Sequence, residues 1–207
     1  MPTSMRLIAD NLSQRYDDLA VFSGLSFAVS SGQALVVTGT NGSGKSTLLR
    51  TIAGLMPPAS GGVRLEGAAE DQPISELCHY VGPLNAIKPE LTARQNLAQW
   101  CGILGPKGAS TVNVALTRLG LDRFADMPAL VLSTGWRRRL GLARVLVVKR
   151  PLWLLDEPTA ALDLAASRMV SGVIRQHLAD GGLAVIATHL DLDLAGAQTL
   201  ELSVASS

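Results

Sequence analysis

The chain has 207 residues, of which 47% are hydrophobic, so it can bury a substantial core and is not a disordered protein. Lysine and arginine total 18 against 17 aspartates and glutamates, and the net charge of +1 gives no long-range attraction to nucleic acid or anionic lipid. Aromatic residues make up only 4%, which also disfavours a surface for stacking single-stranded bases, so composition predicts no nucleic-acid partner.

The sequence predicts neither a secretory signal nor a membrane-spanning segment. The start, MPTSMRLIADNLSQRY, has neither the long apolar stretch nor the cleavage site of a secretory signal. No apolar run reaches the roughly 18 residues needed to cross a bilayer, so a function at a membrane would require a partner that spans it. Cys78 and Cys101 form no CxxC pair and are expected to be reduced thiols in a cytosolic compartment.

Strand patterns occur in two forms along the chain. The first 33 residues and the segment 61–67 have the alternation and turn residues of short strands, which predicts an antiparallel β section near the N-terminus. Continuous apolar runs at 34–39, 152–157 and 183–189 predict buried parallel strands.

Helical periodicity fills the segments between these runs. The expected helices cover residues 45–55, 92–104, 112–121 and 164–179. Alternating strands and helices predict an α/β fold with right-handed crossovers. Because residues from about 84 to 145 contain no convincing strand, we expect a helical subdomain there, inserted into a single domain that spans 1–207.

The segment GTNGSGKST directly follows the first predicted parallel strand and opens a helix, with Gly39, Gly44, Lys45 and Ser46 matching the phosphate-binding pattern G-x-x-x-x-G-K-[ST]. Glycines let backbone N–H groups surround phosphates, and the helix N-terminus adds positive potential. Lys45 would reach the β- and γ-phosphates, and the Ser46 hydroxyl would ligate Mg²⁺. The predicted phosphate-binding residues are Gly39, Thr40, Asn41, Gly42, Ser43, Gly44, Lys45, Ser46 and Thr47.

The segment LWLLDEP ends another predicted strand with two carboxylates. Hydrolysis at a P-loop needs one group for the metal shell and another for the attacking water. Asp156 would hold Mg²⁺ through its water shell, and Glu157 would polarise the water. Alternation sends neighbouring strand residues to opposite sides, but at the end of a strand the chain turns, so both can face the crevice.

Together with LSTGWRRRLGLAR, LLDEPTAALD and ATHLD, the P-loop segment resembles the ATP-binding-cassette (ABC) ATPases in motif order and approximate spacing, over nearly the full chain. The resemblance implies the P-loop NTPase fold of that family, with an N-terminal antiparallel β section and an inserted helical subdomain. It also implies that ATP and Mg²⁺ are bound and that ATP hydrolysis drives a membrane transporter.

In that family, the residues that match Ser133 and Gly135 cap a helix whose N-terminus points at the γ-phosphate of ATP held by a second copy. The resemblance therefore implies a head-to-tail dimer that encloses two ATP molecules. For Arg137, Arg138 and Arg139 we expect a charge run in which at least two side chains are solvated.

Three further positions match the family. Tyr16 matches an aromatic residue that stacks on adenine, although a lone structural tyrosine is an alternative. Asp163 matches an aspartate that contacts the second copy. His189 matches a histidine that would bond the γ-phosphate and hold Glu157 and the water, so Lys45, Glu157 and His189 are the expected catalytic residues.

Two positions depart from the family pattern. Trp136 stands where the signature motif usually has glutamine. Pro83 stands where the family has a glutamine that senses metal and water, and Asn85 is only a weak substitute. Metal coordination and coupling to partners are therefore expected to differ from the usual pattern.

The segment NAIKPELTARQNLAQW and the short tail after His189 are similar to the ATP-binding subunits of bacterial haem exporters in cytochrome c biogenesis. This implies integral membrane permease partners, a peripheral position on the cytoplasmic face of the inner membrane, and a contact near residues 84–92. The alternatives are the ATPase subunit of another ABC exporter and, with less support, a P-loop small-molecule kinase.

Overall fold

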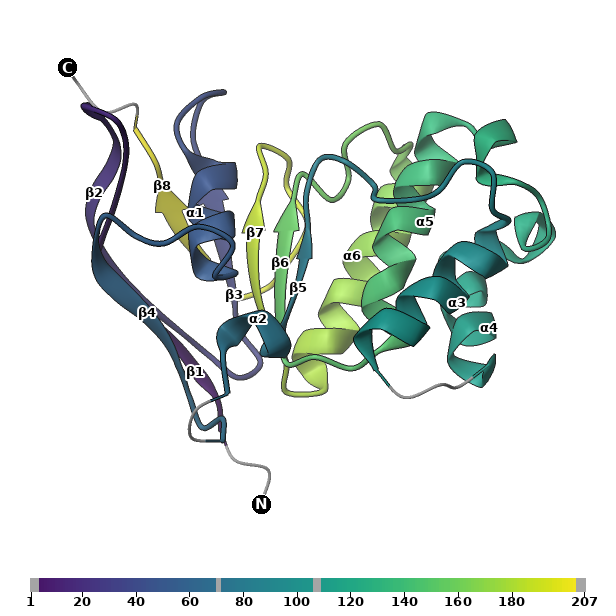
Figure 1. Cartoon of the computed structure of the whole chain (residues 1–207), viewed down its shortest axis with the longest axis horizontal. Helices are drawn as coiled ribbons and strands as arrows, with labels where there is room; N and C mark the ends of the chain where they lie inside the picture. Colours follow the sequence, from purple (N-terminus) through teal and green to yellow (C-terminus); the bar gives the residue numbers. More distant parts are fainter. Residues whose placement is uncertain (1–3, 70–71, 106–108, 204–207) are drawn as a thin grey trace. The chain divides into compact units, whose positions relative to one another are not determined.

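The computed structural model describes residues 4–69, 72–105 and 109–203 (Figure 1). Two compact units divide the chain. One, the core unit, consists of Met1–Gly82, Arg150–Glu157 and Arg175–Ser207. The other, the helical unit, consists of Pro83–Lys149 and Pro158–Ile174.

A three-stranded antiparallel sheet forms from the N-terminal part of the core unit. Its strands are β1 (Arg6–Tyr16), β2 (Leu19–Ser30) and β4 (Ser60–Glu66), in the order β2-β1-β4. Leu7, Ala9 and Leu12 on β1 are buried, so this strand has one apolar face, as the alternating pattern indicates. The structure confirms the predicted antiparallel β section.

A five-stranded sheet of parallel pairs forms the rest of the core unit's β structure, in the order β5-β6-β7-β3-β8. Its strands are β3 (Ala34–Thr38), β5 (Cys78–Val81), β6 (Leu152–Asp156), β7 (Leu183–Ala187) and β8 (Gln198–Glu201). Every residue of β6 and β7 is buried, which explains their continuous apolar runs. The predicted strands are confirmed as β3, β6 and β7, whereas the prediction missed β5 and β8.

Helix α1 (Lys45–Ile52) lies between the two sheets (Figure 1). Leu48 and Leu49 of α1 share one apolar core with Leu7 of β1 and with Leu154 and Val185 of the parallel sheet. Burying one such leucine contributes about 1.5–3 kcal/mol. This core fixes the start of α1, and with it the phosphate-binding loop, against both sheets.

A short helix, α2 (Ile74–Leu77), leads into β5. Arg150 fastens this junction, since its Nη1 donates to the carbonyl oxygens of Ser75 at 2.9 Å and Cys78 at 2.6 Å. Burial raises the pKa of the Cys78 thiol to about 11, although the positive charge of Arg150 opposes the shift. The thiol therefore stays protonated, and unreactive, at neutral pH.

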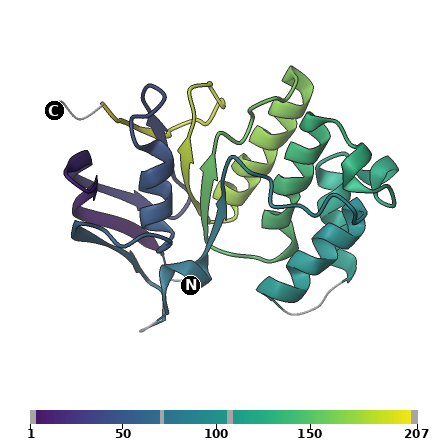
Figure 2. The same ribbon diagram turned by 45° about the horizontal axis from the view of Figure 1, so that its top comes forward.

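The helical unit is built on α3 (Ala93–Leu104), α4 (Ala109–Arg118) and α5 (Thr134–Val147), which pack against one another (Figure 2). Each helix buries a leucine, namely Leu97 on α3, Leu116 on α4 and Leu140 on α5. Two 3₁₀ turns, η1 (Asp122–Phe124) and η2 (Ala129–Val131), join α4 to α5. Helix α6 (Leu164–Ala179) begins in the helical unit and ends in the core unit. No helix in the described part of the chain has both the length and the apolarity to cross a bilayer.

Candidate nucleotide-binding site

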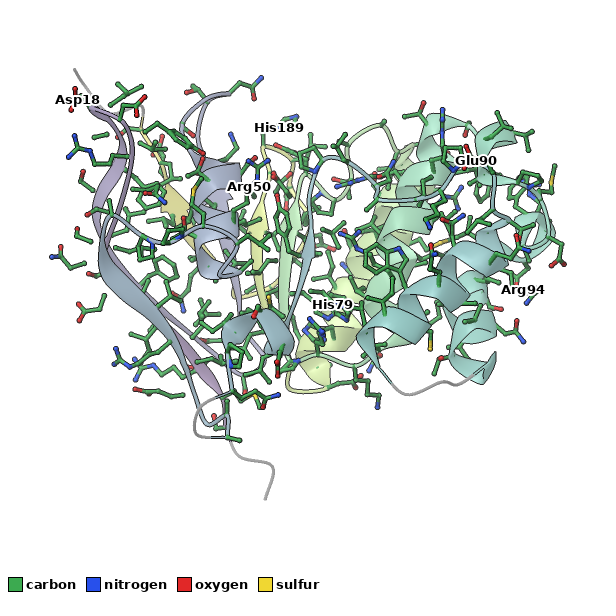
Figure 3. All side chains as sticks on the ribbon, viewed as in Figure 1. Asp18, Arg50, His79, Glu90, Arg94 and His189 are labelled. Atoms are coloured by element: carbon green, nitrogen blue, oxygen red, sulfur yellow. The ribbon has the colours of Figure 1, made fainter. Side chains whose placement is uncertain are left out.

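The predicted phosphate-binding and hydrolytic residues of the core unit lie at one edge of the parallel sheet. The phosphate-binding loop follows β3, Asp156 and Glu157 lie at the end of β6, and His189 follows β7. Because the strands are parallel and β7 lies between β6 and β3, these segments meet at the carboxyl edge. Figure 3 shows His189 at this edge and His79 toward the opposite end of the sheet.

The loop between β3 and α1 takes its shape from glycines. Gly39 has a φ of 137°, and a Cβ there would lie 2.3 Å from the carbonyl oxygen of Leu202. Gly44 has a φ of 96°, and a Cβ would lie 2.6 Å from Cγ1 of Val21. Both positions therefore combine a left-handed backbone with close packing that only glycine allows. The motif glycines at 39 and 44 are thus explained by conformation and space together.

Lys45 is held at the mouth of the loop. Its Nζ donates to the carbonyl oxygens of Gly39 at 2.7 Å and Thr40 at 2.9 Å, and the residue is only 8% exposed. The lysine follows Gly44, the N-cap of α1, where the first helical N–H groups have no carbonyl partners within the helix. A fixed ammonium and these amides create a local site of positive potential suited to phosphate.

The remaining loop residues differ in their access to solvent. Thr40, Asn41 and Gly42 are exposed and Ser46 is partly exposed, so these can meet a ligand directly. Ser43 and Thr47 are buried, so their side chains shape the loop from within.

The two predicted hydrolytic carboxylates occupy a sharp bend. Asp156 is the last residue of β6 and is buried, whereas Glu157 has a φ of 48°, which is rare for a residue other than glycine. The Glu157 N–H donates to the carbonyl oxygen of Ala187 at 2.8 Å, which anchors the bend to the end of β7. Such a conformation costs about 1–3 kcal/mol and persists where the surroundings enforce it, often at functional sites.

Glu157 and His189 are brought together across 32 positions of sequence. Nδ1 of His189 lies 3.1 Å from Oε1 of Glu157, a hydrogen-bonding distance. The histidine side chain is 65% exposed and the glutamate side chain 22%, so the pair opens toward solvent. A carboxylate steadied by an imidazole at the rim of a phosphate site can accept a proton from a bound water.

Oxygen donors for a divalent cation are available at the same edge. Mg²⁺ prefers hydroxyl, carboxylate and water oxygens, and the Ser46 hydroxyl and the Asp156 carboxylate are such donors on α1 and β6, which pack against each other. The residues present therefore fit this cation.

Tyr16 ends β1, away from the apolar core. The residue is 46% exposed, and its hydroxyl lies 3.8 Å from Sδ of Met56. An exposed ring of this kind can stack on a base.

The signature residues belong to the helical unit. Ser133 is the N-cap of α5, and its Oγ accepts from the Trp136 N–H at 3.4 Å. A Cβ on Gly135 would lie 3.2 Å from the carbonyl oxygen of Ala161, so the helix start is closely packed on the segment that precedes Asp163. The Asp163 side chain accepts from the Ala166 N–H at 2.7 Å and caps the start of α6.

The expectation that at least two arginines of the run 137–139 are solvated is wrong. Arg138 is only 4% exposed, and its Nη1 donates to Oδ1 of Asn85 at 3.1 Å. Arg139 is half-buried against the Trp136 ring, with Cζ 3.5 Å from the ring centroid. Arg137 is also partly buried. Helical spacing turns these side chains to different sides of α5, where partners distant in sequence receive them.

The loop that lacks the expected glutamine is tied to α5. The Asn85 carbonyl and Cα lie 3.0 and 3.1 Å from where a Cβ on Gly141 would be, so the loop packs directly on the helix backbone. Since the Asn85 side chain accepts from Arg138, it has a structural partner within the helical unit. Pro83, in the expected glutamine position, offers no side-chain donor or acceptor.

Asn96 is a residue that the sequence reasoning missed. It is 2% exposed; its Oδ1 accepts from the Lys88 N–H at 2.7 Å, and its Nδ2 donates to the carbonyl oxygens of Lys88, Leu91 and Thr92. The same segment pairs with η2, since the Ala129 N–H donates to the Leu91 carbonyl at 2.9 Å. The only local signal was the capping box of α3, Thr92 with Gln95, which marks the helix start but not this network.

The sequence was compared with protein families and with known proteins, and both comparisons indicate an ATP-binding protein of a transporter. Residues 22–160 match the family model described as ABC transporter. The cytochrome c biogenesis ATP-binding export protein CcmA of Mesorhizobium japonicum is 52% identical over 202 residues, covering 97% of this chain and 100% of the relative. CcmA of Chelativorans sp. is 50% identical over 199 residues, covering 96% and 98%.

Solved structures give the same fold. A dimeric ATP-binding cassette in a post-hydrolysis state, bound to ADP and phosphate, matches with a TM-score of 0.82 at 24% identity, covering 95% of this chain and 96% of the other. The architecture is thus the α/β P-loop fold of ABC ATPases. The family match over most of the chain, and relatives at half identity over nearly all of it, establish that this chain belongs to the ABC transporter family.

Proposed function

We propose that this chain is the ATP-hydrolysing subunit of a membrane transporter that delivers haem, or releases it from a chaperone, for attachment to c-type apocytochromes. The observation that carries the proposal is the arrangement at the carboxyl edge of the core sheet, where a phosphate loop, a buried aspartate and a Glu–His pair meet. The printed names of the half-identical relatives, which are export proteins of cytochrome c biogenesis, support the choice of process.

Nucleotide binding begins at the phosphate loop. The amides at the start of α1 and the ammonium of Lys45 receive the β- and γ-phosphates, and the Tyr16 ring stacks on adenine. Ser46 and Asp156 would hold Mg²⁺, which would neutralise charge on the phosphates when bound.

Hydrolysis is the task of Glu157 and His189. The glutamate orients the attacking water and accepts its proton, while the histidine holds the carboxylate in place and bonds the γ-phosphate. The bend at Glu157 is anchored through its main chain to Ala187, so the backbone that carries the carboxylate stays in place independently of the bond to His189.

A second copy of the chain completes each site. Ser133 and the Gly135 amide, at the positive end of α5, act on the γ-phosphate held by the partner, so two chains arranged head to tail enclose two ATP molecules. The related cassette solved as a dimer with ADP and phosphate supports such an assembly. ATP binding closes this dimer, and hydrolysis reopens it.

The motion passes to permease subunits at the cytoplasmic face of the inner membrane. The segment 84–92 is the proposed contact, since Leu84 is 85% exposed and Pro89 and Glu90 are also exposed. Asn96 and the pairing with η2 hold this segment in a fixed shape, as a transmitting surface requires.

Complementation tests the proposed process. The gene is placed in a bacterium whose own haem-export ATPase has been deleted, and covalently bound haem is stained in gels of its c-type cytochromes. Wild type should restore the stained bands, whereas Lys45→Ala, expressed to the same level, should not. Active ATPase in the purified chain, with no restoration of the bands when its cognate permeases are co-expressed, would reject haem delivery.

A further inference from the structure

An aromatic and cationic layer supports the first turn of α5. The Trp136 ring lies 4.3 Å from the Phe124 ring, centroid to centroid, at an angle of 59°. Cζ of Arg139 lies 3.5 Å from the Trp136 centroid, and Cζ of Arg123 lies 5.1 Å from it. Both guanidinium–ring distances fall within the range of about 6 Å in which cation–π pairs attract, and the two tilted rings are in close contact.

Arg139 is fixed from its other side. Its Nη1 donates to the carbonyl oxygen of Leu119, the residue that follows α4, at 3.2 Å. Gly120 leaves room for the guanidinium, since a Cβ there would lie 3.3 Å from the same nitrogen. Burial lowers the pKa of Arg139, and the charge of Asp163 opposes that shift. Because an arginine guanidinium remains protonated in proteins despite such a shift, Arg139 is a cation that joins the Trp136 ring to the end of α4.

The aromatic and cationic layer supports the same turn of α5 that Ser133 caps weakly. Ser133 Oγ and the Trp136 nitrogen are 3.4 Å apart, near the upper limit for a hydrogen bond, so the cap alone holds the turn loosely. Trp136 carries both the aromatic ring and the N–H that Ser133 caps. Fixing its ring against Phe124 and Arg139 therefore fixes the backbone that carries Ser133 and Gly135.

We infer that Trp136 is a positioning residue for the half of the ATP site that this chain supplies to its partner copy. The ring, clamped between Phe124 and Arg139, keeps the Ser133 hydroxyl and the Gly135 amide oriented for the γ-phosphate before the dimer closes. A glutamine at this position offers no aromatic face to the guanidinium. The inference rests on the proposed head-to-tail dimer.

The experiment separates the two halves of the site. In a Glu157→Gln background, nucleotide affinity is measured on dilute monomer with a fluorescent ATP analogue, and ATP-dependent dimerisation by sedimentation. With Glu157 intact, kcat and KM are measured. We expect Trp136→Gln to weaken dimerisation and lower kcat by about tenfold each, the size of one buried cation–π contact, without changing monomer affinity. Trp136→Phe should remain within about threefold of the parent, because it keeps a ring face.

Two further variants test whether the effect comes from the contact between Trp136 and Arg139. Arg139→Met removes the cation, keeps a long apolar side chain, and should reproduce the effect of Trp136→Gln, so it decides the matter if that variant fails to fold. Trp100→Gln breaks a different Trp–Arg pair of this unit, in which Cζ of Arg144 lies 5.0 Å from the Trp100 ring. It should lower the melting temperature without changing dimerisation.

Two failures are distinguishable. If the parent dimerises with ATP but folded Trp136→Gln or Arg139→Met dimerises and hydrolyses equally well, the role of Trp136 is wrong and the proposed function stands. If the parent binds ATP and never dimerises, the shared site itself fails, and the inference fails with it.

Discussion

Replacing Glu157 by glutamine isolates the chemical step. The amide keeps the size of the side chain. In the wild-type chain Oε1 of Glu157 lies 3.1 Å from Nδ1 of His189, and the amide oxygen can still accept a hydrogen bond from that nitrogen. The bend is held by the main-chain bond to Ala187, which the substitution leaves intact. What disappears is the ability to accept a proton, so kcat should fall by about 10² to 10⁴-fold, equivalent to roughly 3–5 kcal/mol.

Phosphate release under saturating ATP measures this loss, and fluorescent-nucleotide titration measures binding, which should stay within about twofold. Glu76→Gln is the matched control, since Glu76 is an exposed carboxylate on α2, which precedes β5 and so lies at the amino edge of the parallel sheet, opposite the carboxyl edge that holds the site. Hydrolysis at the normal rate by Glu157→Gln would refute the assignment of the base. Loss of nucleotide binding would instead mean that the carboxylate supports the fold of the site.

Three further predictions concern the scaffold. Gly39→Ala should abolish nucleotide binding in a titration, because its Cβ would collide with the Leu202 carbonyl. Asn96→Ala should lower the free energy of unfolding in urea by about 2–3 kcal/mol, since several hydrogen bonds to the 88–92 segment are lost. Burial lowers the pKa of His177 in the folded chain. Below about pH 6.5 the unfolded chain therefore binds more protons than the folded chain, and the free energy of unfolding decreases as the pH is lowered. His177→Phe should make the free energy of unfolding depend less on pH in urea titrations from pH 7.5 to 5.

The phosphate loop could be predicted because its requirements are local. Gly39 and Gly44 are dictated by backbone angles within a few residues, and the apolar run of β3 marks the strand that carries the loop. The serine cap of α5 was equally readable, since Ser133 acts on an N–H three residues away. Such signals survive in a single sequence because the interacting groups are neighbours.

Other features depend on contacts that sequence proximity does not encode. Strands β5 and β8 have four residues each and obtain their hydrogen bonds from β6 and β3, so their own patterns are too short to reveal them. The partner of Arg138 lies 53 positions away at Asn85, and a run of three arginines gave no hint that one is buried. Sequence reasoning therefore located the phosphate loop and the helix cap better than the long-range contacts that support them.

The central claim is that each ATP is held by one chain and acted on by another, and mixing two inactive variants tests it most directly. Lys45→Ala removes the phosphate grip, and Gly135→Asp sets a carboxylate at the start of α5, so each variant alone should hydrolyse little ATP. Random pairing in an equal mixture makes about half of the dimers mixed, each with one intact site of two, so about a quarter of the wild-type rate should return. A mixture that forms mixed dimers with ATP yet remains as inactive as its components would contradict the shared site.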